Sequence, residues 1–108
     1  MSHSHDLPPR PELGCYMLRE VHQGKADGVL MAHTQAEEAA IYAAGNILAV
    51  QGYACRLVRM VDPALFQAQT QAYQDSLLPP CLPLLSPEEG EAPASLAARM
   101  AACLRPQV

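Results

Sequence analysis

The residues from His33 to Glu37 form the strongest candidate for a ligand site in this chain of 108 residues. Thr34 can accept a backbone N–H as a helix N-cap, and Glu37 three residues later completes a capping box. A helix N-terminus that follows a strand of an α/β sheet attracts anions, and His33 can titrate near neutral pH. We therefore consider a small-anion or nucleotide sensor at His33, Thr34, Gln35 and Glu37. An ordinary capped helix is the alternative, because Glu37 and Glu38 would repel an anion.

The cysteines offer weaker support for chemistry. The four of them lie far apart without a C-x-x-C pair, which favours small buried hydrophobic side chains over a zinc or redox site. Cys15 or Cys55 could act as a nucleophile only with a base such as His22 or His33 beside it, and both cysteines fall within apolar segments. Ser76 has no G-x-S-x-G surroundings. The sequence thus predicts no catalytic residue and no metal ligand.

Two further polar clusters have simple structural interpretations. His3 and His5 could hold a transition metal weakly, but their position favours a flexible tail. Glu88, Glu89 and Glu91 could form a carboxylate pair for acid–base work, but they lie among prolines. That context predicts a solvated loop.

Composition excludes several classes of partner. Half of the residues are hydrophobic and 5% are aromatic, which predicts an aliphatic core. The formal net charge of −4 argues against nucleic acid and acidic membrane surfaces as partners. The longest apolar stretch, residues 39–50, is too short to span a membrane. The first residues lack the pattern of a secretion signal, so we expect a cytoplasmic protein.

The elements that must position these residues alternate between strands and helices. Apolar runs predict strands at Gly14–Glu20, Gly28–Ala32 and Ala54–Val61. Capping and stop signals predict helices from Thr34 to about Gly52, from Pro63 to about Leu77, and over residues 94–105. The prediction is a small three-layer-like α/β domain, with about three strands in a mixed sheet and flanking helices. We expect the first two strands to form an antiparallel hairpin and the second and third a parallel crossover unit.

The chain divides into four predicted parts. Residues 1–12 are expected to be a flexible arm, 13–80 the α/β domain, 81–93 a linker rich in Pro and Glu, and 94–105 a C-terminal helix. The helices at 39–50 and 96–104 carry apolar surface that a three-stranded sheet need not cover. This surface could contact another chain, or the last helix could fold back over the sheet.

Three motifs carry a family resemblance. Residues 14–18 match G-x-Y-x-L, and residues 51–60 match E-G-[IV]-x-x-R-V-V-S-[ML]-P at Gly52, Arg56, Val58 and Met60. Residues 65–79 match F-x-x-Q-x-x-x-Y-x-x-S-[VI]-L-P. This set resembles the first part of the C-terminal domain of transketolase. The family's A-T-G-S-E turn is altered here, since residues 32–37 contain no glycine.

The resemblance implies a fold without its own active site. In transketolases, thiamine diphosphate and its metal sit between two other domains, held by a G-D-G motif with a downstream Asn and activated by a Glu, and this sequence has none of these motifs. The resemblance therefore implies a non-catalytic packing or association module, or a remnant of a larger thiamine-dependent enzyme.

Two alternatives to that interpretation stay open. One is an accessory subunit that completes a split transketolase, which would transfer ketol units between sugar phosphates. The other is the sensor at Thr34. Thiamine diphosphate and a divalent metal would be reached only through partner chains, because we expect a chain of this length to be too small to enclose them. The partner would be a second copy or a thiamine-dependent subunit.

Overall fold

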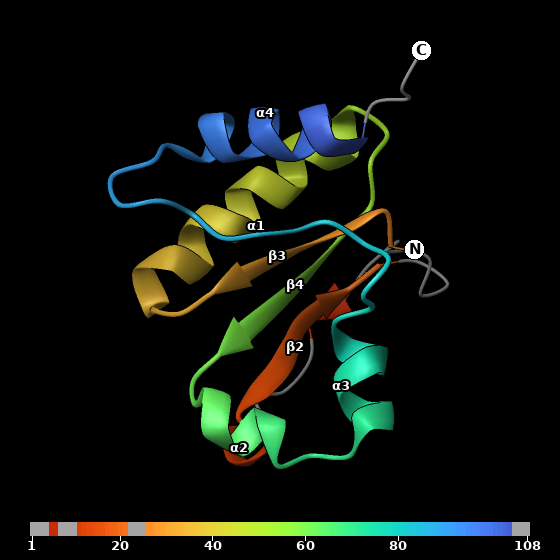
Figure 1. The fold of residues 1–108 in the computed structure, drawn as a ribbon. Helices are drawn as coiled ribbons and strands as arrows, with labels where there is room; N and C mark the ends of the chain where they lie inside the picture. The colour runs from red at the N-terminus through yellow and green to blue at the C-terminus, as the bar shows by residue number, and fades with distance from the viewer. Residues whose placement is uncertain (1–4, 7–10, 22–25, 105–108) are drawn as a thin grey trace.

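A mixed sheet of five strands in the order β1-β2-β4-β3-β5 forms the centre of the structure, a computed structural model (Figure 1). It describes residues 5–6, 11–21 and 26–104. The three long strands are β2 (Cys15–Glu20), β3 (Gly28–Ala32) and β4 (Cys55–Met60). Two strands of 2 residues each, β1 (His5–Asp6) and β5 (Leu84–Leu85), were not predicted and lie at the two edges.

The strand pairing corrects one prediction and confirms another. β2 pairs antiparallel with β4, with Cys15 opposite Met60, so the predicted hairpin between the first two strands is wrong. β3 pairs parallel with β4, with Gly28 opposite Cys55, as predicted for the crossover unit. The physical reason is burial: the first four residues of β4 are buried, so this strand is stable at the centre, between β2 and β3.

The first helix follows its sequence signals. α1 (Gln35–Val50) begins after Thr34, which has an extended backbone and whose side chain accepts a hydrogen bond from the Glu37 N–H. The helix ends before Gly52, which has a φ of 93° in the left-handed region that glycine tolerates. The predicted start and end of this helix are therefore confirmed.

The helix predicted from Pro63 to Leu77 is two helices. α2 (Pro63–Gln67) is capped by Asp62, and α3 (Gln71–Leu77) is capped by Thr70, whose Oγ1 accepts from the Tyr73 N–H. Thr70 is a second N-cap and begins a new helix, although apolar residues at helical spacing predict a single helix over this segment. A short 3-10 helix, η1 (Pro11–Leu13), precedes β2.

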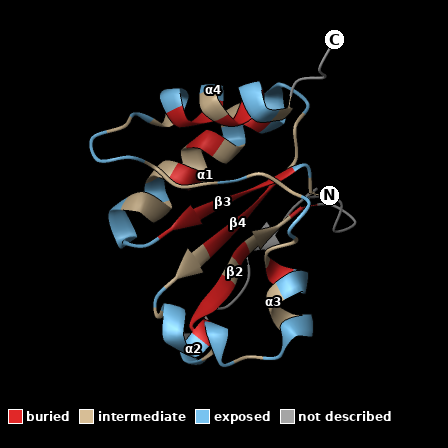
Figure 2. Ribbon diagram, in the orientation of Figure 1, coloured by how far each residue is buried: buried red, intermediate tan, exposed pale blue. Residues whose placement is uncertain are grey.

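Helices cover both faces of the sheet and give the predicted three layers (Figure 1). α1 and α4 (Pro93–Leu104) lie over one face, and α2 and α3 lie over the other. Figure 2 shows the long strands as the most buried part of the fold. Side chains on the α1 face, such as Leu30, Leu48 and Leu57, form one core cluster, and Cys15, Val29, Val58 and Phe66 belong to the cluster on the other face.

The last helix folds back over the sheet. Leu96 and Met100 of α4 are fully buried, and a Cβ on Gly28 would come within 2.8 Å of the Met100 Sδ atom. Residues 81–93, expected to be a solvated linker, contain β5, in which Leu84 pairs with Val29 of β3. Apart from β1 and residues 11–12, the predicted N-terminal arm lies outside the described residues.

Candidate functional site

The predicted anion site is the exposed N-terminus of α1. The Thr34 Oγ1 accepts from the Glu37 N–H at 3.1 Å, which confirms the N-cap. Glu37 reaches back further than a capping box requires, and its Oε1 accepts from the His33 N–H at 2.9 Å. The His33 Nδ1 lies 3.3 Å from the same oxygen. The structure thus brings His33, Thr34 and Glu37 together around a carboxylate, and Gln35 is exposed beside them.

A second carboxylate lies at the same end of the sheet. Glu38, in the first turn of α1, forms an ion pair with Arg59 near the end of β4. Because β3 and β4 are parallel, their carboxyl ends meet at one edge, which is where ligands bind in many open α/β sheets. Here the His33 N–H before the helix and the nearby Arg59 already have carboxylate partners, which are Glu37 and Glu38. An incoming anion would have to compete with both of them.

The cysteines do not form a nucleophilic site. Burial raises the pKa of the Cys15 thiol to about 12, and burial, aided by the charge of Asp27, raises the pKa of Cys55 to about 12. The two thiols belong to core clusters on opposite faces of the sheet. Cys81 and Cys103 are exposed free thiols, and His22 lies outside the described residues.

The remaining candidates have structural roles or cannot be described. The Ser76 hydroxyl donates to the Tyr73 carbonyl at 2.8 Å within α3. Glu88 and Glu89 are exposed, whereas Glu91 accepts two hydrogen bonds from Arg99 at 2.8 and 2.6 Å. His3 and the side chain of His5 lie outside the described part of the chain.

Neither a metal cluster nor a membrane span occurs in the described part of the chain. In residues 5–6, 11–21 and 26–104, His, Cys, Asp and Glu side chains form no group of three or more that could hold a metal ion. Within the same ranges, no helix has the length and apolar character needed to cross a membrane.

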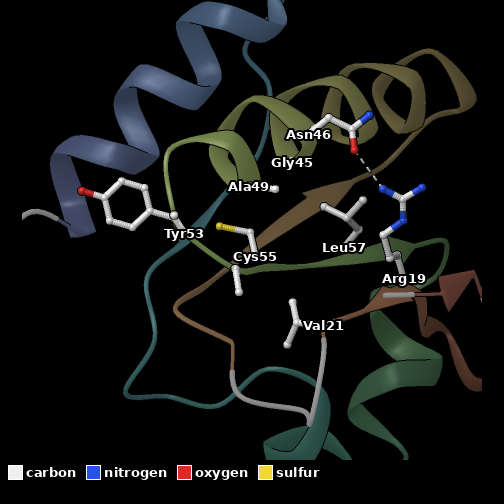
Figure 3. A pocket seen from close by; sticks show the side chains of 10 residues that line it. Arg19, Val21, Gly45, Asn46, Ala49, Tyr53, Cys55 and Leu57 are labelled. Carbon is white, nitrogen blue, oxygen red and sulfur yellow. Dashed lines mark hydrogen bonds between the residues drawn. The ribbon is translucent and has the colours of Figure 1, made fainter. Parts of the chain in front are cut away.

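The structure also contains a pocket that the sequence did not indicate. It has a volume of about 310 Å³ and lies between the second half of α1 and the ends of β2 and β4. Figure 3 shows Arg19 and Asn46 at one end and Tyr53 at the other, with Cys55 and Leu57 between them. Sequence reasoning missed it because its walls come from three segments, and only the β2–β4 pairing brings Arg19 to α1.

Residues of the family motifs connect the helices on one face to the sheet. Gly14, with a φ of 81°, packs its Cα against the backbone of α2. Arg56 connects two strands to the end of α3. The Tyr73 hydroxyl donates to the Cys15 carbonyl at 2.8 Å, and its ring meets Phe66 edge to face. The motif residues thus join α2 and α3 to the sheet.

Comparison with known proteins agrees with this α/β architecture. The transketolase-like TK C-terminal domain family matches residues 14–100. The chain belongs to this family.

The curated relatives are full transketolases. Over 77 residues, the chain is 43% identical to a plasmid-encoded transketolase of Cupriavidus necator and 44% identical to the chromosomal transketolase of the same organism. Each alignment covers 71% of this chain and 11% of the relative. The chain therefore spans about a tenth of the length of the curated relatives it matches.

Solved transketolases share the fold. A structure from Pichia stipitis superposes with a TM-score of 0.71 at 22% identity, covering 86% of this chain and 18% of that one. A structure from Campylobacter jejuni gives a TM-score of 0.62 at 25% identity, with 89% and 18% covered. The three-layer α/β arrangement is thus that of part of a transketolase.

Proposed function

We propose that this chain is a non-catalytic association domain of a thiamine-dependent, transketolase-type enzyme. The observation that supports this best is the family match over residues 14–100, combined with relatives of which the chain spans only 11%. The motif residues support the same interpretation, because Gly14, Arg56 and Tyr73 make contacts within the fold. Their geometry serves the packing of α2 and α3 on the sheet.

In this proposal, the reacting groups belong to other chains. Thiamine diphosphate and a divalent metal would be bound by a partner polypeptide, and ketol transfer between sugar phosphates would occur there. The contribution of this chain is a folded surface against which the partner packs. Neither its buried thiols nor its capped α1 N-terminus takes part in the reaction.

The test compares the chain alone with the chain in its native assembly. We expect the purified chain to show no ketol transfer and no heat of thiamine diphosphate binding in calorimetry. Isolated from its own cells through an affinity tag, it should copurify with a thiamine-dependent chain and with ketol-transfer activity. Light scattering on the purified chain shows whether it self-associates, which distinguishes a homo-oligomer from binding to a thiamine-dependent chain. Activity or tight thiamine diphosphate binding by the chain alone would refute the proposal.

A further inference from the structure

The pocket beside α1 has the size and the lining of a small-molecule site. Its volume of about 310 Å³ lies at the lower end of the range of ligand sites, roughly 300–1,000 Å³. Its floor consists of three buried side chains from β4 and the residue after β2, which are Cys55, Leu57 and Val21. Figure 3 shows them below the second half of α1. The floor of the pocket is therefore apolar.

Small residues on α1 create this space. A Cβ added to Gly45 would lie 3.3 Å from the Leu57 Cδ2 atom, so the helix approaches β4 closely at this point. Ala49, one turn later, is exposed and adds only a methyl group to the wall. The helix packs on β3 and β4, so the space over the end of β2 is left unfilled.

Arg19 closes one end of the pocket and is held there by its neighbours. The register between β2 and β4 shifts between Met17 and Arg19, and this β-bulge turns Arg19 toward α1 (Figure 3). One terminal nitrogen donates to the Asn46 Oδ1 at 3.1 Å, and the guanidinium carbon lies 4.7 Å from the centre of the Tyr42 ring. Across the strand pair with β1, Asp6 stands opposite Arg19. The charge of Arg19 is thus engaged, and its side chain serves as a wall of the pocket.

The rest of the lining is uncharged. Apart from Arg19, the described residues that line the pocket have no charged side chain. The Asp27 carboxylate lies close by and accepts from the Ala54 N–H at 2.8 Å. A charged ligand would therefore lose its hydration without gaining an uncommitted ion-pair partner from these residues. An apolar ligand gains free energy by leaving water for the same surface.

We propose that this pocket binds a small uncharged molecule with an apolar body, such as an aliphatic alcohol. The body would lie over Leu57 and Val21, and a hydroxyl group would stay in contact with water at the rim, beside the exposed Asn46. Carboxylates and sugar phosphates fit less well, because their charges would be desolvated. This ligand site is independent of the proposed association with a thiamine-dependent chain.

The test titrates the purified chain with four probes and follows the backbone amide signals of residues 45–57 by NMR. Hexan-1-ol carries the apolar body without a charge, and butan-1-ol is shorter by two methylene groups. Hexanoate and hexylammonium carry the same body with a negative or a positive charge. We expect saturable shifts with hexan-1-ol and binding about tenfold weaker with butan-1-ol, because less apolar surface leaves water. Both ions should bind at least about tenfold more weakly than hexan-1-ol.

Matched variants assign the binding to this pocket. Ala49→Leu should fill the pocket and abolish saturable shifts with hexan-1-ol, while unchanged amide signals outside residues 45–57 show that the variant is folded. Ala98→Leu adds the same side chain at an exposed position of α4 outside the lining and should bind like the parent.

Several results would overturn the proposal. Tighter binding of hexanoate or hexylammonium than of hexan-1-ol would show that the pocket selects a charge. Equal affinity for the two alcohols would show that the apolar floor is not the binding surface. Unchanged binding in Ala49→Leu, or no saturable shift at all, would remove the pocket as a ligand site. A mass of two copies by light scattering that falls on Ala49→Leu substitution would show that the pocket receives a second chain instead.

Discussion

Arg56 and Glu20 form a two-point ion pair between neighbouring strands. The Arg56 Nε lies 3.1 Å from one Glu20 carboxylate oxygen, and a terminal nitrogen lies 3.0 Å from the other. The second terminal nitrogen donates to the carbonyls of Ser76 and Leu77 at 2.7 and 3.0 Å. One side chain, only 6% exposed, thus connects β2, β4 and the C-terminal end of α3.

Replacing this arginine should destabilise the fold strongly. Arg56→Met removes the guanidinium donors from two α3 carbonyls and from the Glu20 carboxylate, whose Oε1 still accepts from the Val21 N–H. We expect the free energy of unfolding in urea to fall by about 3 kcal/mol. The control Glu89→Gln, at an exposed position, should change it by less than about 0.5 kcal/mol. A loss below about 1 kcal/mol for Arg56→Met would show that the ion pair contributes little beyond its desolvation cost.

Gly14 provides a second test of how the family motif works. A Cβ at this position would lie 2.3 Å from the Phe66 nitrogen and 2.5 Å from the Asp62 carbonyl oxygen, both backbone atoms. Gly14→Ala should therefore lower the unfolding free energy by more than about 3 kcal/mol, or prevent folding. Gly90→Ala is the matched control, because Gly90 has a similar φ of 74° and nothing within 4 Å. That change carries only the backbone strain, roughly 1–2 kcal/mol. Equal losses from the two changes would contradict the close approach of α2.

Three features could be predicted because each depends on neighbours in sequence. They are the helix N-cap at Thr34, the buried strand at 28–32 and the end of the helix near Gly52. The pairing of β2 could not, since a hairpin and a central β4 give the same local pattern. The break between α2 and α3 was hidden by apolar residues that continue at helical spacing across it. Capping by Thr70 decides the break, and a threonine inside a periodic segment is a weak signal.

The contacts of Arg56 and Arg19 could not be predicted from the sequence, because they join residues that lie far apart in the chain. Arg56 lies 20 residues from the Ser76 carbonyl that it binds, and Arg19 lies 27 residues from Asn46. The family motif marks Arg56 but not the groups that it binds, and no local pattern marks Arg19. The β-bulge at Leu18 reverses the face of Arg19, so strict alternation along β2 predicts the wrong side of the sheet for this side chain.

Glu91 should make the packing of the preceding loop on α4 sensitive to acid. Hydrogen bonds from Arg99, and then from the Glu88 N–H, lower the pKa of this carboxyl to about 2 from its ordinary value of 4.5. Because the folded pKa is below the unfolded one, the stabilisation is present above about pH 4.5 and is lost as the pH falls toward 2. Urea midpoints measured between these values should fall with acidity, and the fall should be smaller in Glu91→Gln. Glu89→Gln should keep the parent's fall, and an identical pH profile for Glu91→Gln would contradict the assignment.

The anion site at His33, Thr34, Gln35 and Glu37 stays a prediction, and the geometry says how to test it. The Glu37 carboxylate accepts from the His33 N–H, so its negative charge lies at this turn and would compete with an incoming anion. Phosphate or sulfate titration should therefore shift the amide signals of residues 33–37 weakly in the parent chain. Glu37→Gln removes the competing charge and should strengthen the shifts several-fold. Thr34→Ala serves as a control for the cap and should cost about 1 kcal/mol of stability. Absence of any anion-dependent shift in both the parent chain and Glu37→Gln would leave this turn as a helix cap alone.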